Sequence, residues 1–446
     1  MIIPLRAGAR PLGRLGDLLH TRIPSDMASL TPKRLVTDSR EVQSGDLFCA
    51  LKGKEDGHAY IRDALSRGAL AVLCEQSTDT KAPCFTVPSV RDALASWAAS
   101  SCIGRRPYRI GITGSVGKTT VKEAVAALLS IQFQTHATFE NQNNDLGVPF
   151  TLLSCPSEAE MLVCELGVNH PGEMRALSAA LRPHLAIITC IGHAHIGAFG
   201  TRQAIAEEKR EILHFAAEDA KIFVPINEPL LVFLVPHGMQ RYEIAPLEER
   251  EANGITSLKD DVPRQFALAY AAAVGKAVGM SKEAIREGLV RAANAMPRRK
   301  EEQYRNLCLI DDGYNASPES MFAALLYLSR KNGGRRVAVL GDMLELGERS
   351  DAYHRAVGRF AASHASLLCF YGAYAMEYAK GAESGGARPF GSGVGTEAEF
   401  VILHGKKEEM AKEIVSLLRG DETLLFKASR ALQTEVLIGH VKAMYS

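Results

Sequence analysis

Residues 111–120 read Gly-Ile-Thr-Gly-Ser-Val-Gly-Lys-Thr-Thr, and this stretch with the elements on either side of it decides the fold. A short apolar run, residues 108–110, comes directly before it. In the segment after it, apolar residues recur every three or four positions, at Val121, Ala124, Val125, Leu128 and Leu129. That spacing predicts an amphipathic helix with a single apolar face. A strand that passes through a glycine-rich turn into a helix is the setting in which phosphate-binding loops occur.

The glycines of this stretch allow main-chain N–H groups to close around an anion, while Lys118 extends an ammonium group toward the outer phosphates. The hydroxyl of Thr119 is placed to ligate Mg²⁺. The common Walker spacing requires a glycine where Ile112 stands, so the motif is a shorter form that begins at Gly114. The alternative, an accidental glycine-rich turn, leaves the Lys-Thr-Thr sequence and the flanking elements unexplained. We therefore expect a nucleoside triphosphate to bind here.

The composition of the chain is that of an ordinary globular protein. A length of 446 residues suggests about three domains, and 46% hydrophobic residues are ample for their cores. With 52 basic and 51 acidic side chains, nothing indicates a nucleic-acid partner. Residues 1–20 lack the apolar stretch of a signal peptide or a membrane span, so we expect a cytoplasmic protein, and we expect a monomer. Nine cysteines without a Cys-x-x-Cys pair are expected to be reduced core residues.

Short apolar runs alternate with helical segments along the whole chain, which predicts an α/β protein of three domains. Residues 1–104 form the expected N-terminal α/β domain. Residues 105–296 carry the phosphate loop and are predicted to form a parallel sheet covered by helices. Residues 297–446 are predicted to form a doubly wound, Rossmann-like domain. Within it, the Gly- and Ser-rich stretch 381–395 is predicted to be a mobile loop.

Two predicted strands of the central domain end in side chains that suit a metal ion. The apolar run 161–166 ends at Glu165, and open α/β sheets bind ligands at the carboxyl ends of their strands. Glu165 is therefore a candidate Mg²⁺ ligand, against the alternative of an edge carboxylate that faces water. The run 185–191 leads into His193 and His195. One of these imidazoles is expected to reach the same metal, unless both are ordinary hydrogen-bonded loop histidines.

Lys209 lies on a predicted helix, and its neighbours three and four residues away are all apolar: Ile205, Ala206, Ile212 and Leu213. This spacing directs the lysine inward. A buried ammonium group tends to lose its proton, and the neutral amine is nucleophilic enough to capture CO₂ as a carbamate. The sequence alone favours the alternative, in which the stem covers apolar surface and the head group stays in water.

Arg299 and Asp312 flank a predicted strand at the junction of the second and third domains. We expect them to close over a nucleotide, and the alternative is an interdomain salt bridge. Ser317 stands directly before Pro318, an arrangement that predicts the beginning of a helix with a serine N-cap.

Together these residues resemble the Mur ligase family of peptidoglycan synthesis, and the resemblance covers nearly the whole chain. Within that family the chain is similar to the branch that adds D-alanyl-D-alanine to a UDP-N-acetylmuramoyl tripeptide. The matching motifs are Thr37-Asp-Ser-Arg40 and residues 45–53 in the first domain; the phosphate loop and residues 141–149, 165–173 and 194–200 with Lys209 in the second; and residues 311–318, 340–348 with His354, and 427–430 in the third. The Asp-Asn-Pro-Arg motif of the branch that adds diaminopimelate or lysine is missing from the sequence.

The resemblance implies an ATP-dependent, ADP-forming amide ligase that works through an acyl phosphate and requires Mg²⁺. Its implied catalytic residues are Lys118, Glu165, His195 and a carbamylated Lys209. Its implied ATP-binding residues are Gly114, Ser115, Val116, Gly117, Lys118, Thr119, Thr120, Arg299 and Asp312. The metal is implied at Thr119, Glu165, His195 and Lys209. Contacts with the UDP-muramoyl tripeptide or the dipeptide are implied at Ser39, Arg40, Asn143, Asn144, Tyr314 and Asn315.

The chain departs from the family pattern on the adenine side, where Pro263 and Arg264 stand in place of a His-Asn pair. Arg298, Ser317 and Ala428 also replace the usual glycine, asparagine and glycine. None of these changes removes an implied phosphate or metal ligand, so we expect activity with an altered nucleotide affinity. Two other functions remain open: a paralogous Mur or folylpolyglutamate-type ligase that acts on another carboxylate, and a nucleotide-binding regulator without catalysis.

Overall fold

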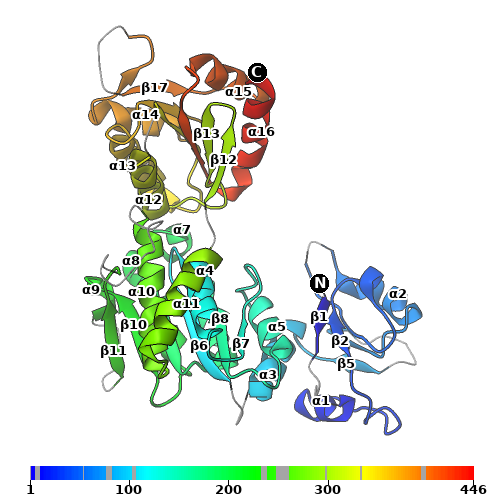
Figure 1. The fold of residues 1–446 in the computed structure, drawn as a ribbon. Helices are drawn as coiled ribbons and strands as arrows, with labels where there is room; N and C mark the ends of the chain where they lie inside the picture. Colours follow the sequence, from blue (N-terminus) through cyan, green and yellow to red (C-terminus); the bar gives the residue numbers. More distant parts are fainter. Residues whose placement is uncertain are drawn as a thin grey trace.

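The structure is a computed structural model of the chain. It describes residues 2–5, 11–53, 55–76, 83–102, 107–232, 239–247, 261–296, 299–331, 334–392 and 398–445. The ribbon forms three α/β parts, and the central part lies between the other two (Figure 1). Both predicted domain junctions, at residues 104–105 and 296–297, involve positions outside the described residues.

The N-terminal part is built on a five-stranded sheet in the order β1-β2-β3-β4-β5. Its strands are β1 Ile2–Pro4, β2 Arg34–Val36, β3 Leu47–Cys49, β4 Ala71–Cys74 and β5 Cys84–Thr86. β1 runs antiparallel to β2, and the other neighbours are parallel. Its helices are α1 Leu12–Leu18, η1 Ser39–Glu41, η2 Gly57–Tyr60, α2 Ile61–Ser66 and α3 Val90–Cys102. The three apolar runs that lead to β3, β4 and β5 are visible in the sequence, whereas β1 has only three residues and too little pattern to predict.

The central part is an all-parallel sheet in the order β11-β10-β9-β6-β8-β7. Its strands are β6 Tyr108–Thr113, β7 Thr135–Ala137, β8 Met161–Glu165, β9 Leu185–Ile188, β10 Lys221–Pro225 and β11 Gln240–Ile244. Its helices are α4 Lys118–Leu129, α5 Gly147–Ser154, α6 Glu173–Leu181, α7 Ile196–Phe199, α8 Arg202–Arg210, η3 Glu211–Leu213, α9 Pro229–Val232, α10 Val262–Ala277 and α11 Lys282–Ala295. β6 lies between β8 and β9, so the strand order reverses beside it, and such a reversal is where open α/β sheets bind ligands.

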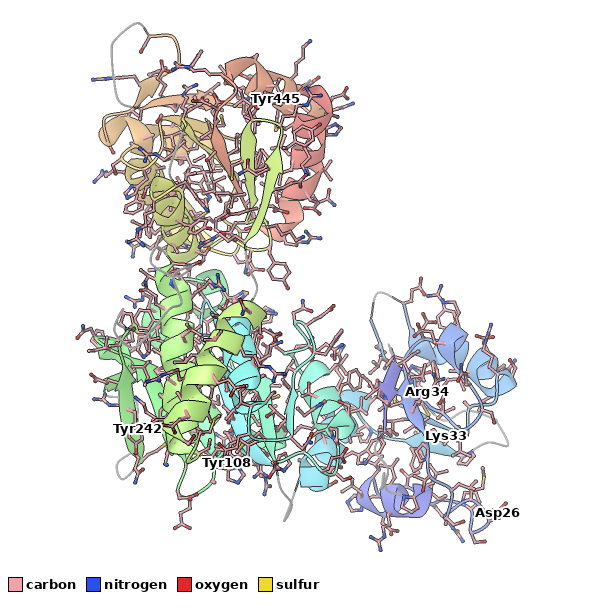
Figure 2. The ribbon with its side chains drawn as sticks, in the orientation of Figure 1. Asp26, Lys33, Arg34, Tyr108, Tyr242 and Tyr445 are labelled. Carbon is pink, nitrogen blue, oxygen red and sulfur yellow. The ribbon has the colours of Figure 1, made fainter. Side chains whose placement is uncertain are left out.

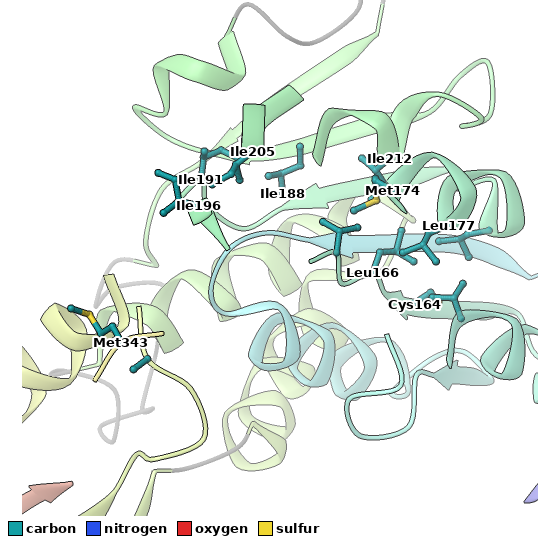
Figure 3. Close-up of a cluster of buried hydrophobic side chains, with 14 of the residues drawn as sticks. Cys164, Leu166, Met174, Leu177, Ile188, Ile191, Ile196, Ile205, Ile212 and Met343 are labelled. Atoms are coloured by element: carbon teal, nitrogen blue, oxygen red, sulfur yellow. The ribbon is translucent and has the colours of Figure 1, made fainter. Parts of the chain in front are cut away.

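Helices cover both faces of the central sheet, which is why its strands read as continuous apolar runs. On one face α4 packs against α10 and α11, and all five apolar residues predicted for α4 are buried. On the other face, side chains from β8 and β9 meet those from α6, α8 and η3, among them Cys164, Ile188, Leu177, Ile205 and Ile212 (Figure 3). The central core therefore fixes β6, β8 and β9 side by side with their carboxyl ends aligned.

The C-terminal part is a seven-stranded sheet in the order β12-β13-β18-β14-β15-β17-β16, parallel except for the edge strand β12. Its strands are β12 Lys300–Tyr304, β13 Leu307–Asp311, β14 Arg336–Leu340, β15 Leu367–Phe370, β16 Arg388–Pro389, β17 Glu399–Ile402 and β18 Thr423–Lys427. Its helices are α12 Pro318–Ser329, η5 Gly347–Arg349, α13 Ser350–Ala361, α14 Ala375–Ser384, α15 Lys407–Leu417, η6 Arg430–Leu432 and α16 Thr434–Met444. The predicted doubly wound arrangement and the Ser317 N-cap of α12 are confirmed.

The prediction of a mobile loop over residues 381–395 is wrong for residues 381–384, which belong to α14, and for Arg388–Pro389, which form β16. Gly381 of α14 serves close helix packing, because a Cβ added there would lie 2.0 Å from the Arg355 carbonyl oxygen of α13. Gly358 of α13 meets the Tyr378 carbonyl in the same way, at 2.1 Å. Residues 393–397 of the predicted loop lie outside the described part of the chain.

The central sheet is oriented so that the carboxyl ends of its strands face the C-terminal part. Figure 2 labels Tyr445 on the C-terminal part and Tyr108, the first residue of β6, on the central part. Tyr108 lies at the end of the central part that is farther from the C-terminal part. The chain therefore leaves β6 at the side where the two parts meet, and this side carries the phosphate loop. Among the described residues, none of the helices has the length and apolar character needed to cross a membrane.

Candidate nucleotide and metal site

The phosphate loop, residues 111–120, runs from the end of β6 into α4 as predicted. Its first glycine has no room for a side chain, since a Cβ on Gly114 would lie 1.9 Å from the Thr189 hydroxyl oxygen, and its φ is +148°. Thr189 donates a hydrogen bond to the Val116 carbonyl at 2.6 Å. The Ser115 amide donates to the Cys190 carbonyl at 3.0 Å, and the Ser115 hydroxyl accepts from the Gly192 amide. Residues that follow β9 therefore hold the loop in place.

Lys118 and Thr119 occupy the first turn of α4, where unpaired main-chain N–H groups and the helix dipole favour an anion. The Lys118 ammonium folds back and donates to the Gly114 carbonyl at 2.9 Å. Thr120 follows in the same turn, and these three side chains are half-buried. The segment from Gly114 to Thr120 thus has the form of a phosphate cradle built before any ligand arrives.

Glu165 ends β8 beside this loop, because β8 pairs with β6 in a register that places Glu165 opposite Ile112. Its side chain is 1% exposed. Oε1 accepts a hydrogen bond from the Asn143 side chain at 2.7 Å, while the buried Oε2 has no hydrogen-bond partner among the described residues. An unpaired buried carboxylate oxygen is costly in free energy, and a cation next to it would remove that cost. The alternative of a carboxylate facing water is wrong.

The residues present fit a magnesium ion with few protein ligands. Mg²⁺ typically takes one or two carboxylates together with water and phosphate oxygens. Within the described ranges, no group of three or more His, Cys, Asp or Glu side chains is arranged to enclose a metal by itself. The unpaired oxygen of Glu165 and the hydroxyl of Thr119 are the donors that fit such an ion.

Lys209 lies on α8 and points inward, with only 4% of its surface exposed. Its ammonium makes no hydrogen bond or ion pair with any described residue. Burial lowers the pKa of Lys209 to about 7, and the positive charge of Lys118 contributes to the shift. The apolar flanks of this helix are visible as Ile205 and Ile212 (Figure 3). The alternative of a head group in water is therefore wrong, and a large share of the amine is neutral near pH 7.

The two histidines after β9 pair with carboxylates of the C-terminal part. His193 Nδ1 lies 2.5 Å from Glu319 Oε1, and His195 Nδ1 lies 2.5 Å from Glu345 Oε2. The Gly197 amide donates to the Glu345 carbonyl at 2.9 Å, so the contact involves main chain as well. Burial lowers the pKa of His195, against the opposing effect of Glu345. His195 thus stands at the predicted strand end, but in this arrangement its ring contacts Glu345.

Arg299 connects the central and C-terminal parts through two carboxylates. Its guanidinium lies 3.2 Å from Asp261, which caps α10, and 3.4 Å from Asp312, which follows β13. It also lies over the ring of Tyr327 at 4.2 Å. Lys427, 2% exposed, pairs with the same Asp312 oxygen at 3.2 Å, and burial lowers the pKa of this lysine. The interdomain salt bridge is therefore present, and it gathers the two residues expected at the nucleotide.

The residues expected to contact substrate fall into two groups. Ser39 and Arg40 lie in η1 of the N-terminal part; Arg40 pairs with Asp38 and lowers the pKa of that carboxyl to about 2. The others lie near the central site. Asn143 contacts Glu165, and Asn144 accepts from the Leu146 and Gly147 amides where α5 begins.

Tyr314 and Asn315 belong to the C-terminal part. The Tyr314 hydroxyl accepts from the Asn141 side chain at 2.8 Å, and the Asn315 carbonyl accepts from Lys427 at 2.9 Å. On the adenine side, Arg264 lies in the first turn of α10 and donates to the Ala293 carbonyl of α11. This arginine therefore connects two central helices, at a position where the family pattern has one residue of a His-Asn pair.

Sequence reasoning missed several residues that shape the site: Lys122, Thr189, Asp261, Glu319 and Glu345. Thr189, Glu319 and Glu345 act through contacts between segments far apart in the chain, which no local pattern encodes. Lys122 did carry a signal, because it follows Lys118 by one helical turn on a helix whose neighbouring positions Val121 and Val125 are apolar.

Three regions of the chain match domain models of one protein family. Residues 33–101 match the Mur ligase family catalytic domain, residues 112–237 match the Mur ligase middle domain, and residues 298–430 match the Mur ligase glutamate ligase domain.

Similar proteins carry a common name. The UDP-N-acetylmuramoyl-tripeptide–D-alanyl-D-alanine ligase of Treponema pallidum is 36% identical over 372 residues, 75% of this chain and 80% of that protein. The ligase of the same name from Bacillus subtilis is 30% identical over 431 residues, 91% of this chain and 92% of that protein. Among solved structures, MurF from Acinetobacter baumannii superposes with a TM-score of 0.83 at 27% identity, over 99% of this chain and 100% of that chain. MurF from Thermotoga maritima in complex with ADP has a TM-score of 0.77 at 25% identity, over 96% of this chain and 99% of that chain.

Proposed function

Because the chain belongs to the Mur ligase family, we propose that it is an ATP-dependent, ADP-forming ligase that adds D-alanyl-D-alanine to a UDP-N-acetylmuramoyl tripeptide during peptidoglycan precursor synthesis. The observation that carries the proposal is the intact phosphate loop beside Glu165, whose buried Oε2 has no partner. The substrate is proposed from the names of relatives that are 30–36% identical to this chain over most of its length. The use of ATP and of a UDP-linked precursor favours the cytoplasm as the place of the reaction.

We assign the substrates to the three parts of the chain. The UDP-linked substrate binds to residues 1–104, with Ser39 and Arg40 near its nucleotide. ATP binds to residues 105–296. Residues 297–446 receive the dipeptide and close over ATP, bringing Arg299 and Asp312 to the nucleotide.

The reaction proceeds in two transfers. The terminal carboxylate of the tripeptide attacks the γ-phosphorus of ATP, the bond between the β- and γ-phosphates breaks, and ADP and an acyl phosphate result. The amine of D-alanyl-D-alanine then attacks the acyl carbon, an amide forms, phosphate leaves, and the amine releases a proton to solvent. The main-chain N–H groups from Gly114 to Lys118 and the Lys118 ammonium hold the phosphates in line and offset their negative charge.

The groups that fit Mg²⁺ are Thr119 and Glu165, and His195 and Lys209 would be further ligands. When bound, Mg²⁺ supplies additional neutralisation of the phosphate charge. The neutral amine of Lys209 would add to CO₂ and release one proton, so that a neutral buried amine becomes a carbamate anion that suits a metal site. Contacts between the C-terminal and central parts exclude water, which would otherwise hydrolyse the activated acid.

The test is phosphate release from ATP with UDP-N-acetylmuramoyl tripeptide, with and without D-alanyl-D-alanine. We expect release that requires both substrates and a product whose mass increases by one dipeptide residue. The same assay with a matched set of other carboxylate acceptors distinguishes the proposed ligase from a paralogous ligase, which would use one of those acceptors instead. A regulator without catalysis would bind ATP and release no phosphate with any pair.

A further inference from the structure

Lys122 is one of the largest fully buried side chains in the described protein, with 1% of its surface exposed. It lies on α4, three residues after Thr119 and four after Lys118, so it stands one turn behind the phosphate loop. A lysine is rarely buried to this extent unless its charge is paired. What surrounds its ammonium group therefore shows what the residue does.

The ammonium group reaches away from the loop to the segment that follows β7. It donates to the Thr138 carbonyl at 2.8 Å and to the Glu140 carbonyl at 3.1 Å, and it pairs with Glu123 Oε1 at 2.7 Å. Two of the three partners are main-chain oxygens of one short segment, residues 138–140. Only the third, the partly exposed Glu123, balances the charge.

This segment has a conformation that needs support. Glu140 has a φ of +47°, in the left-handed region that residues other than glycine rarely adopt. Phe139 beside it is 67% exposed and contributes little packing. Strained main chain persists only where surrounding contacts determine it. The Lys122 ammonium, bonded to the carbonyls on both sides of Phe139, is such a contact.

The supported segment leads directly to the side chains around Glu165. The Thr138 hydroxyl accepts from the Glu165 amide at 3.0 Å. The Asn143 side chain donates to Glu165 Oε1 at 2.7 Å, and the Asn143 carbonyl accepts from the Gly167 amide at 2.8 Å. Asn143 therefore occupies one carboxylate oxygen and leaves the other, Oε2, unpaired and available to a cation.

The same segment also reaches the C-terminal part. The Asn141 side chain donates to the Tyr314 hydroxyl at 2.8 Å. One main-chain segment, residues 138–143, therefore connects the helix of the phosphate loop, the carboxylate of the candidate metal site and the domain expected to close over the nucleotide.

We propose that Lys122 is a positioning residue that fixes residues 138–143, so that Asn143 orients the Glu165 carboxylate toward the metal and Asn141 meets Tyr314. Lys122 itself contacts neither nucleotide nor metal. The metal part of the inference rests on the proposed function, whereas the ordering of the segment does not. Side chains that orient a metal ligand commonly affect metal affinity about 10- to 100-fold when they are replaced.

The test compares Lys122→Met with wild type in two measurements. The first is amide hydrogen exchange without ligand, where we expect faster exchange in residues 139–144 and unchanged exchange in α10 and α11. The second is Mn²⁺ binding in the presence of ADP, followed by electron paramagnetic resonance, where we expect affinity to fall at least about tenfold. ADP binding in EDTA should change less than about twofold, because Lys122 does not touch the phosphate loop main chain.

Three variants control the comparison. Val125→Ala shortens a buried apolar side chain on the same helix without touching the segment, so it reports general destabilisation. Glu123→Gln removes the counter-charge of Lys122 and keeps both carbonyl bonds, so we expect lower stability but exchange in residues 139–144 close to that of wild type. Lys122→Arg keeps a charged donor and should restore part of the Mn²⁺ affinity. Lys122→Gln replaces Lys122→Met if the latter does not fold.

Unchanged exchange in residues 139–144, or an equal loss of Mn²⁺ affinity in Val125→Ala, overturns the positioning role. Failure of the proposed function has a different signature. In that case wild-type protein releases no phosphate when both substrates are present, while the exchange comparison still reports whether Lys122 orders the segment.

Discussion

At the scale of single residues, Lys209 has the most unusual environment in the site: it is buried, makes no hydrogen bond with a described residue, and has a pKa lowered to about 7 mainly by burial. Replacing it with alanine should abolish ligase activity, because the proposed carbamate anion can no longer form. Added short-chain carboxylates should restore part of the activity by occupying the vacated space. Phosphate release with both substrates, measured over a series of formate and acetate concentrations, checks this expectation. Full activity of the variant without additive would contradict the carbamate.

The same lysine predicts how stability depends on pH. In the unfolded chain its pKa is the ordinary 10.5, whereas in the folded protein it is about 7. Between these values the unfolded state binds one more proton, so the free energy of unfolding rises with pH from about 7 to 10.5. Below pH 7 the charge is buried at full cost. Lys209→Met has no ionisable group at this position, so it lacks this pH-dependent part of the free energy of unfolding.

We therefore expect the melting temperature of Lys209→Met to exceed that of wild type most at pH 6, and the difference to shrink as pH rises toward 10. The comparison is made without added bicarbonate, so that carbamate formation does not stabilise the wild type. An exposed lysine replaced in the same way, Lys412→Met, is the control. A difference that is constant with pH would show that Lys209 is not titrating in this range.

At the scale of elements, the phosphate loop depends on one glycine for its fit against the strand end of β9. Gly114→Ala would place a methyl group 1.9 Å from the Thr189 hydroxyl oxygen, so the loop must move. We expect ADP binding, measured by calorimetry, to weaken at least about tenfold, since the main-chain N–H groups no longer converge on the phosphates. Gly279→Ala is the matched control: its φ is +82°, and no atom lies within 4 Å of the added methyl. Equal ADP affinity in Gly114→Ala and wild type would contradict a phosphate role for this loop.

Elements with strong local pattern were predictable, and those fixed by distant contacts were not. The five apolar positions of α4, the end of β8 at Glu165 and the Ser317 cap of α12 all follow from spacing or capping chemistry within a few residues. Gly381 of α14 was misinterpreted because the reason for it lies in α13, which packs against it.

The same distinction holds within the candidate site. The inward direction of Lys209 could be read from its neighbours on the helix. The pairing of Thr189 with the phosphate loop and of Asn143 with Glu165 requires the fold, because these residues meet only through the order of strands in the central sheet.

At the scale of the whole molecule, sequence predicted three parts and, as an alternative at Arg299 and Asp312, one interdomain salt bridge, but not the other contacts between the central and C-terminal parts. Two histidine–carboxylate pairs, His193 with Glu319 and His195 with Glu345, join the central and C-terminal parts. Glu345 has a φ of +67°, and its carbonyl also accepts from Gly197, so this loop has a specific conformation that suits the contact. Glu345 pairs with Nδ1 of His195, so the expected metal would bind through Nε2 of the same ring, and the carboxylate would orient that ring.

Replacing both carboxylates, in Glu319→Ala/Glu345→Ala, should loosen the contact between the two parts in the protein without ligand. We expect the radius of gyration from small-angle X-ray scattering to increase relative to wild type, because both histidine–carboxylate pairs are lost, while the Arg299 ion pairs, the Asn141–Tyr314 hydrogen bond and the main-chain bond from Gly197 to Glu345 remain. Glu383→Ala, an exposed change on α14, is the control. Because Glu345 does not use Nε2 of His195, Mn²⁺ affinity in the presence of ADP should stay close to that of wild type while the molecule expands. A fall in Mn²⁺ affinity would mean that Glu345 supports the site directly, and an unchanged radius of gyration would mean that other contacts hold the two parts together.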